Sequence, residues 1–254
     1  MTVRPPTPGE RFGVPLPGGT SVSHVRVYDT IGPDGLAGGS PHLHTTCTEA
    51  YLVIAGDGMV QTLSGEGYRE TPLAAGTIAW FSPGTIHRLV NLDGRLELYV
   101  VMSNAGLPEA GDMILAFEPA LLGDPATYRR HADLPSDALT TAGSSDPAMR
   151  RRDLAVSGFI HWRDAVMADG PAALDPLYRS AVDLLGDRPA HWSELLDLDP
   201  AGDIERARRQ VEALAASDRS SVADALRSSA IRSHSLHPDT RRMGCCGTLG
   251  TVVH

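Results

Sequence analysis

The sequence predicts a mainly β domain followed by a mostly α-helical C-terminal extension, and three observations carry this prediction. Up to about residue 105, short segments of alternating apolar and polar residues, rich in β-branched side chains, are separated by glycine turns. From residue 119 onward, alanine, arginine, aspartate and leucine dominate, and apolar residues recur at helical spacing. His42 and His44 stand two positions apart, which places both side chains on one face of a β-strand.

The β half contains several short strand candidates. Gly56-Asp-Gly58, Ser64 to Gly67 and Asp93-Gly94 are typical turn sequences between them. Many short strands joined by glycine turns suit a double-sheet jelly-roll barrel. The expected strands cover residues 22–31, 49–55, 59–63, 68–73, 76–81, 87–91 and 96–102.

The chain divides into three parts on composition. We expect an irregular, proline-rich arm over residues 1–19, the barrel over 20–118, and a helical extension with an irregular tail over 119–254. Residues 135–146 have the composition of a linker. An apolar stripe over residues 204–215 must bury against something, so we expect the extension to pack on the barrel and to cover part of its cavity mouth. The expected helices cover residues 154–168, 171–185, 204–215 and 222–231.

Composition excludes several functions. The net charge of -9 over 254 residues argues against a protein that binds nucleic acid. All 22 basic residues are arginine, so lysine Schiff-base chemistry is excluded. No apolar run approaches the ~18 residues of a membrane helix, and the N-terminus lacks the apolar core of a signal peptide. We therefore expect a cytoplasmic protein that binds neither nucleic acid nor membrane.

Four residues have the chemistry of metal ligands: His42, His44, Glu49 and His87. Imidazole and carboxylate are ligand types for divalent transition metals, and these four would leave a site of net charge about +1 around one ion. The sequence does not separate iron, manganese, nickel, copper and zinc. A site with few protein ligands is open to water, substrate or dioxygen.

Two segments around these residues closely resemble the two signature motifs of the cupin superfamily. The first reads His42-x-His44-x4-Glu49-x6-Gly56, and the second runs from Gly76 through Pro83-Gly84 to His87 and Asn91. The sequence departs from the family in two places. Ser82 stands where the family usually has proline, and the leading glycine of the first motif is offset. The resemblance covers roughly residues 20 to 105 and leaves every ligand position filled.

The resemblance implies a metal-dependent enzyme acting on a small molecule, in a cupin double-stranded β-helix barrel. Within this superfamily, a mononuclear oxygenase of the dioxygenase type suits three histidines and one glutamate best, with iron the metal most associated with it. Two alternatives remain open. One is a metal-dependent isomerase, lyase or cyclase of a sugar or natural-product intermediate, and the other is a non-catalytic cupin that binds a metal or small molecule. Exposed sheet edges further predict a homodimer through the β half.

Strand parity supplies candidates for the rest of the site. Tyr51, two residues after Glu49, shares its face and is our candidate for orienting a substrate or bound oxygen. A buried core tyrosine is the alternative. The first strand places His24, Arg26 and Tyr28 on one face, and in barrels of this type that strand often borders the cavity. The candidates for lining a substrate are Arg26, Tyr28, Gln61 and Trp80.

The three cysteines suit reduced thiols in the cytoplasm. Cys47 lies between ligand candidates, but a small apolar role is the favoured interpretation. Cys245 and Cys246 are adjacent near the C-terminus. They are either a redox or metal element or, as we favour, part of a flexible terminus.

Overall fold

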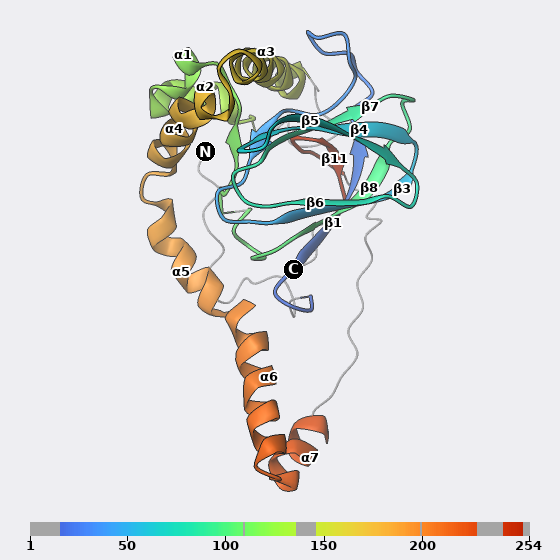
Figure 1. The fold of residues 1–254 in the computed structure, drawn as a ribbon, viewed down its shortest axis with the longest axis vertical. Helices are drawn as coiled ribbons and strands as arrows, with labels where there is room; N and C mark the ends of the chain where they lie inside the picture. The colour runs from blue at the N-terminus through green and yellow to red at the C-terminus, as the bar shows by residue number, and fades with distance from the viewer. Residues whose placement is uncertain (1–15, 109, 136–145, 199, 228–240, 251–254) are drawn as a thin grey trace.

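The computed structural model describes residues 16–108, 110–135, 146–198, 200–227 and 241–250. The first 15 residues of the predicted arm and residues 136–145 of the predicted linker lie outside this range. Two antiparallel sheets face each other and form a barrel, and helices lie against one side of it (Figure 1). The predicted fold class, a β jelly-roll barrel with a helical C-terminal extension, is confirmed.

The six-stranded sheet combines the first strand, β1, with the last two strands, β10 and β11. Its strands β1, β8 and β3 are paired over most of their length. Successive side chains of each strand point to opposite faces of the sheet. The edge strand β6 pairs with β3 alone. The order is β10 (Arg242–Met243), β11 (Gly247–Leu249), β1 (Ser21–Val27), β8 (Glu97–Met102), β3 (Glu49–Ala55) and β6 (Ile78–Phe81).

The five-stranded sheet carries two of the four ligand candidates. His42 lies directly opposite His87, and Thr62 lies opposite His87 from the other side. Cross-strand partners share a face of a sheet, so these side chains point the same way. The order is β5 (Gly67–Ala74), β4 (Asp57–Ser64), β7 (Ile86–Asn91), β2 (His42–Leu43) and β9 (Ile114–Leu115).

Two apolar cores lie on the two faces of the five-stranded sheet. The inner core fills the barrel and includes Val60 and Leu89 with Tyr51 from the opposite sheet. The outer core includes Leu63 and Ile86 and lies between the sheet and the helices. In an ordinary half-exposed sheet this outer face would be polar, so its burial is the reason that β4 and β7 carry apolar residues there too, beside the buried polar side chains of Gln61 and Arg88.

The helical extension forms a chain of helices that starts on the barrel. We expected four helical segments, and their described residues are mostly helical, although residues 228–231 of the last segment lie outside the described range. The helices α1, α2 and α5 were not predicted. In the described part of the chain, no helix is long and apolar enough to span a membrane. The helices are α1 (Pro119–Leu122), α2 (Pro125–Ala132), α3 (Asp146–Asp169), η2 (Pro171–Leu174), α4 (Asp175–Leu185), α5 (Arg188–Leu198), α6 (Pro200–Ala215) and α7 (Arg219–Arg227).

The first helices of the extension cover the outer face of the five-stranded sheet (Figure 1). Phe159 and Trp162 of α3 and Leu177 of α4 are at most 3% exposed and belong to the outer core. The indole nitrogen of Trp162 also donates to the backbone oxygen of Phe117 at 2.8 Å. This part of the extension therefore packs on the barrel, as expected.

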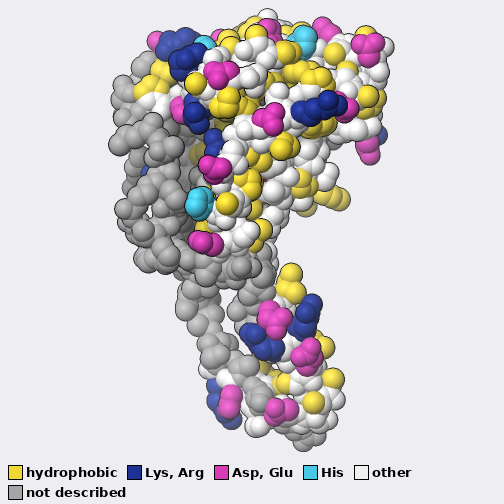
Figure 2. Space-filling view, turned by 90° about the vertical axis from the view of Figure 1, so that its left-hand side faces the viewer, with side chains coloured by type: hydrophobic (Ala, Val, Ile, Leu, Met, Phe, Trp, Pro, Cys, Tyr) yellow, Lys and Arg dark blue, Asp and Glu magenta, His cyan; other side chains and the backbone are white. Residues whose placement is uncertain are grey.

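The apolar stripe of α6 does not pack on the barrel, and our expectation for residues 204–215 is wrong. Ile204, Val211 and Leu214 are 65%, 64% and 63% exposed. Figure 2 shows α6 and α7 standing apart from the main body, with hydrophobic side chains on their surface. Helical periodicity predicts which face is apolar, but it does not predict whether the same chain covers that face.

The C-terminal tail is not irregular in its described part. Strands β10 and β11 form a hairpin, and β11 pairs with β1 through Val25↔Leu249 and Val27↔Gly247. The barrel therefore draws on residues far beyond 118. Gly247 permits this pairing, because a Cβ there would lie 1.9 Å from the backbone oxygen of Arg26.

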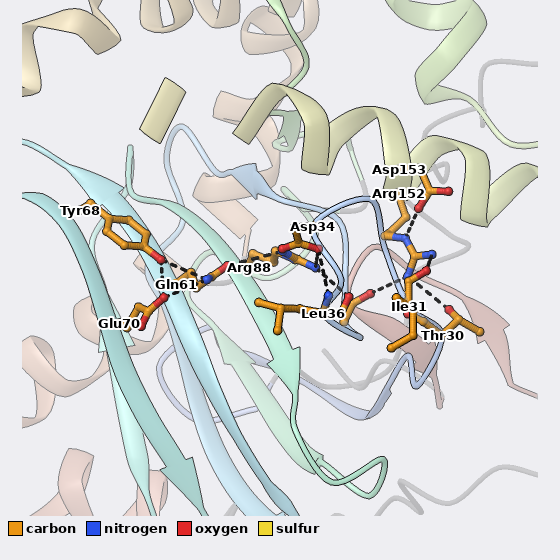
Figure 3. A network of polar contacts seen from close by, with 11 residues as sticks. Thr30, Ile31, Asp34, Leu36, Gln61, Tyr68, Glu70, Arg88, Arg152 and Asp153 are labelled. Atoms are coloured by element: carbon orange, nitrogen blue, oxygen red, sulfur yellow. Dashed lines mark hydrogen bonds and ion pairs between the residues drawn. The ribbon is translucent and has the colours of Figure 1, made fainter. Parts of the chain in front are cut away.

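Polar contacts also tie the outer side of the sheet to the helices (Figure 3). The fully buried guanidinium of Arg88 pairs with Asp34 and contacts Gln61. Arg152 of α3 donates to the backbone oxygens of Thr30 at 2.7 Å and Ile31 at 3.0 Å. The loop after β1 is thus held between β7 and α3, which fixes the strand that carries His87.

Candidate metal centre

The structure brings together His42, His44, Glu49 and His87. One potential ligand atom from each lies within 4.8 Å of the others. The four side chains are buried, with exposed fractions of 3%, 6%, 3% and 0%. Four ionisable groups are costly to bury without a compensating partner. The cluster could hold a metal ion.

Each histidine turns the same ring atom inward. The Nδ1 atom of His42 lies 2.8 Å from the backbone oxygen of Ser40, and that of His87 lies 3.0 Å from the oxygen of Thr85. The Nδ1 atom of His44 contacts the backbone oxygen of Asp112. A carbonyl oxygen only accepts hydrogen bonds, so Nδ1 carries the proton in all three rings. The neutral rings therefore direct the lone pair of Nε2 toward the centre of the cluster.

The inward atoms lie closer together than free lone pairs would favour. The Nε2 atoms of His42 and His87 are 3.1 Å apart. The Oε2 atom of Glu49 lies 3.3 Å from Nε2 of His44 and 3.2 Å from Nε2 of His87, and it has no hydrogen-bond partner of good geometry. Acceptor atoms that face one another across a buried space suit a cation between them, so the donor set fits a divalent metal ion.

The local fold explains why these side chains converge. Strand register sets His42 opposite His87, and Glu49 is the first residue of β3 on the facing sheet. The turn before β7 contains Gly84 at φ 84°, a conformation that glycine adopts without strain. The amide of Gly84 donates to the backbone oxygen of His44 at 2.8 Å, so the turn with Ser82 in place of proline still touches the first motif.

Asp112 is a further site residue that the sequence analysis missed. Its carboxylate accepts hydrogen bonds from the amides of Thr45 at 2.7 Å and of Thr46 and Cys47 at 3.1 Å each, and from both threonine hydroxyls. Its backbone oxygen accepts the bond from His44. Asp112 thereby fixes the loop between two ligand candidates, although no local pattern connects it with residues 65 or more positions earlier.

The pKa shifts follow from burial and from the neighbouring charges. Burial, together with the charges of His87 and His44, holds the pKa of His42 well below its usual value. Burial opposes the charged forms of His44 and Glu49 too. For His44, the hydrogen bond and charge of Glu49 outweigh burial and raise the pKa, whereas the charge of His87 and the contacts with His44 lower the pKa of Glu49 well below its usual value. Glu49 is consequently a carboxylate, and His44 takes up a proton more readily than His42 does.

Tyr51 lies beside the cluster, on the face shared with Glu49. It is fully buried, and its ring centre lies 6.4 Å from that of His87 and 5.4 Å from that of Phe81. Burial, followed by the charge of Glu49, raises the pKa of Tyr51 well above its usual value. The hydroxyl is therefore protonated, and it has no hydrogen-bond partner of good geometry.

The four residues predicted to line a substrate cavity lie elsewhere. Arg26 is 60% exposed and pairs with Glu97, and Trp80 is 72% exposed. Tyr28 donates to the backbone oxygen of Gly244, in a small cluster separate from the inner core. Gln61 joins the network around Arg88 on the outer face of the sheet. These assignments are wrong because the assumed parity of the strands was off by one.

Strand register gives the inward residues instead. Phe81 pairs with Glu49 and Ala79 pairs with Tyr51, so Trp80 must face outward. The ring centre of Phe81 lies 4.3 Å from that of His87, which makes it the aromatic neighbour of the cluster. The alternation of residues along β6 would identify Phe81 as the inward residue only once the pairing of β6 with β3 is known.

The cysteines occupy three different surroundings. Cys47 is 1% exposed in the outer core, which agrees with the favoured apolar role. Cys246 belongs to the inner core, and the Sγ atom of Cys245 lies 2.9 Å from Sδ of Met113. The three cysteines form no disulfide with one another. The helical layer reaches the rim of the cluster through Tyr178 of α4, whose hydroxyl donates to the backbone oxygen of Gly84 at 3.0 Å.

Comparison with known families agrees with this architecture. Residues 28–103 match the family model of the cupin domain. The barrel of this chain therefore belongs to the cupin superfamily, and the resemblance inferred from the two motifs is confirmed. No curated protein matches the sequence significantly.

Three solved structures are similar to part of the chain. The TDP-fucose-3,4-ketoisomerase WlaRA from Campylobacter jejuni is 12% identical, with 32% of this chain and 58% of that chain covered, at a TM-score of 0.28. An uncharacterised double-stranded β-helix protein from Klebsiella pneumoniae is 24% identical, with 40% of this chain and 83% of that chain covered, at a TM-score of 0.26. KdgF from Halomonas sp. is 24% identical, with 27% of this chain and 58% of that chain covered, at a TM-score of 0.23. The chain spans less than two thirds of the ketoisomerase and of KdgF. TM-scores this low carry no conclusion about activity.

Proposed function

We propose that this protein is a metal-dependent cupin enzyme that acts on a small molecule at a mononuclear centre of His42, His44, Glu49 and His87. The observation that carries the proposal is the orientation of the three rings, each of which donates from Nδ1 to a backbone carbonyl and turns Nε2 inward. Three neutral imidazoles and one carboxylate are ligand types that suit a divalent cation, and they leave a net charge of about +1 around it.

Within this function we propose an oxygenase of the dioxygenase type. Proton-transfer chemistry needs an acid or base whose pKa lies near the working pH. Apart from the ligand candidates themselves, the described ionisable groups that interact with Glu49 include Tyr51, Cys245 and Cys246, and burial raises the pKa of each. The other buried imidazole and carboxylate, His24 and Asp112, are engaged with Glu97 and the loop at 45–47. Chemistry at this centre therefore rests mainly on the ion.

The protein residues have defined parts in this mechanism. A redox-active divalent ion would supply the electrons for dioxygen activation, and any divalent ion would polarise a substrate oxygen. Glu49 and the three histidines would hold the ion, and the carbonyls of Ser40, Thr85 and Asp112 keep the rings in the ligating tautomer. Tyr51, which stays protonated beside Glu49, would help to orient a substrate at the centre. The side chain of Phe81 excludes water from the face of His87.

A metal-dependent isomerase or lyase is the second candidate, and Tyr51 is the observation that favours it. A phenol that stays protonated next to the centre would serve as the acid in such a reaction, and the ion held by the four ligand candidates would supply Lewis acidity. This reaction needs no redox-active ion, so zinc would serve.

The experiment that separates these candidates starts from natively purified protein. We expect elemental analysis to find about one divalent ion per chain, and we expect iron, manganese, nickel or copper rather than zinc. Oxygen uptake in the presence of candidate diols, thiols or keto acids would then identify the oxygenase. Stoichiometric zinc, together with turnover under argon, would favour the isomerase or lyase. A purified chain that takes up no divalent metal after incubation with iron, cobalt or zinc would refute the proposed centre.

We also propose that the protein is a homodimer formed through the β half. Strand β6 lies at the edge of its sheet, and its outward residues Ile78 and Trp80 are 61% and 72% exposed. An apolar edge strand is a site of pairing with another chain unless something covers it. A two-fold contact between two β6 strands would cover both.

A further inference from the structure

The C-terminal hairpin lies between β1 and the segment that leads into β2. Strand β11 pairs with β1, and the amide of Tyr28 donates to the backbone oxygen of Cys246 at 3.3 Å. The amide of Ser40 donates to the backbone oxygen of Cys245 at 2.9 Å. The carbonyl of the same residue, Ser40, accepts the hydrogen bond from Nδ1 of His42. Ser40 therefore connects the cysteine pair to a ligand candidate.

The depth of this insertion is fixed by close backbone contacts. A Cβ on Gly39 would lie 2.5 Å from the Cα atom of Cys246, so the hairpin approaches the first motif as closely as glycine allows. Gly244, at the start of the hairpin loop, accepts hydrogen bonds at 2.9 Å from the hydroxyl of Tyr28 and from Arg151 of α3. The hairpin is therefore held in place by the barrel and by the helical layer.

The two cysteines face different surroundings. The side chain of Cys245 contacts the sulfur of Met113. Cys246 is 8% exposed and belongs to the inner core together with Tyr51. Its thiol lies next to the hydroxyl of Tyr51, and both groups adjoin the carboxylate of Glu49.

The hydroxyl of Tyr51 and the Oε2 atom of Glu49 are both fully buried and without a hydrogen-bond partner of good geometry. Buried polar atoms are normally paired, and an exception calls for an explanation. A small movement of the phenol toward the carboxylate would give both atoms a partner, since the hydroxyl donates and the carboxylate accepts. Cys246 packs in the same core as the phenol and its thiol adjoins both of these groups, so it restrains where the phenol lies.

We propose that Cys246 is a positioning residue of the metal centre, whose thiol holds the hydroxyl of Tyr51 against the carboxylate of Glu49. The inference rests on the proposed metal centre and extends it to the C-terminal hairpin. Removing a partner that orients a metal ligand typically lowers metal affinity by about 10-fold to 100-fold. The thiol thus acts through Tyr51, and Tyr51 acts on the orientation of Glu49.

The test measures cobalt binding by the full-length protein, with the affinity and the visible absorption spectrum as the readouts. We expect Cys246→Ala and Tyr51→Phe each to weaken cobalt binding by about 10-fold and to shift the spectrum. The double variant should bind no more weakly than Tyr51→Phe alone, because both changes remove one chain of contacts. Cys246→Ser, which keeps a donor and acceptor of similar size, should remain close to the wild type. Cys245→Ala in the same hairpin is the matched control and should leave the spectrum unchanged.

Two results would overturn the inference. One is wild-type cobalt affinity and spectrum in either Cys246→Ala or Tyr51→Phe, and the other is a double variant whose losses multiply. If Cys246→Ala fails to fold, Tyr51→Phe still decides, because it removes a single oxygen atom from a ring that stays packed. Failure of the wild type itself to bind cobalt would refute the proposed centre, whereas binding by the wild type and both variants alike would refute only the role of Cys246.

Discussion

The Nε2 atoms of His42 and His87 lie 3.1 Å apart, although the Nδ1 atom of each ring already donates to a backbone carbonyl. Both inward nitrogens therefore present lone pairs. Protonating either one would create a positive charge in a buried site, which is unfavourable. The pKa of His42, held well below its usual value by burial and by the neighbouring rings, agrees with this cost. A shared cation resolves the contact between the two nitrogens, which leads to the first prediction.

Replacing any one histidine of the centre should weaken metal binding strongly. We expect His42→Ala, His44→Ala and His87→Ala each to lower the affinity for zinc or cobalt by at least about 100-fold, because an open site has few protein ligands to spare. Isothermal titration measures the affinity. His161→Ala, an exposed histidine on α3, is the control and should bind as the wild type does. Stoichiometric metal in a His42/His44 double variant would contradict the assignment.

Asp112 should matter for metal binding even though it does not join the ligand set. We expect Asp112→Asn to reduce metal affinity by about 10-fold to 100-fold, because the loop that carries His44 and Glu49 loses a charged acceptor. The free energy of unfolding should also fall by about 2 kcal/mol, the order of a lost charge-assisted hydrogen bond. Titration and urea denaturation measure the two effects. A variant that loses stability but keeps full metal affinity would show that the clamp does not position the ligands.

Metal affinity should fall as the pH is lowered, and the direction follows from His44. A ligating imidazole must be neutral, and the pKa of His44 is raised above 6.5 because the hydrogen bond and charge of Glu49 outweigh burial. Above this raised pKa the metal meets no proton on His44, and below it the apparent Kd should rise about tenfold per pH unit. His42 adds no proton in this range, because its pKa is lowered. Cobalt titrations between about pH 5.5 and 8.5 measure the slope, and a flat profile would contradict it.

The sequence predicted the ligand set better than its surroundings, for a physical reason. Ligand identity follows from residue type and spacing, and His42, His44 and Glu49 lie within eight positions. The residues around them depend on strand register, which local pattern does not encode. Trp80 and Phe81 illustrate the point, because a shift of one residue exchanges a solvent-exposed ring for one that touches His87.

Contacts between distant parts of the chain were equally out of reach. Asp112 holds the loop at Thr45 from 67 positions away, and the tail joins β1 through residues more than 200 positions later. Conversely, the stripe on α6 has the expected periodicity but faces outward. Periodicity predicts the element and its apolar side, whereas the partner of that side depends on the whole fold.

A charged residue on the β6 edge should disrupt the proposed homodimer. We expect the wild type to scatter light as a dimer at micromolar concentration and Trp80→Glu to scatter as a monomer, because two like charges would meet across the two-fold axis. The melting temperature of Trp80→Glu should differ from that of the wild type only through the lost dimer contact, since the side chain of Trp80 is 72% exposed. Leu226→Glu on α7, 64% exposed, is the control for a surface apolar residue elsewhere. A wild-type monomer would refute the homodimer.

The helical layer should contribute directly to the stability of the barrel, and Trp162 tests this most sharply. Its side chain is 3% exposed in the outer core, and its indole nitrogen donates to Phe117 just after β9. We expect Trp162→Ala to lower the free energy of unfolding by about 3 to 5 kcal/mol, the usual cost of removing a large buried aromatic side chain. Met167→Ala, 70% exposed on the same helix, should change it by less than about 0.5 kcal/mol. Urea denaturation followed by the circular dichroism of the strands measures both. If Trp162→Ala melted only the helical signal and left the strand transition where it was, α3 would be an appendage rather than part of the barrel's core.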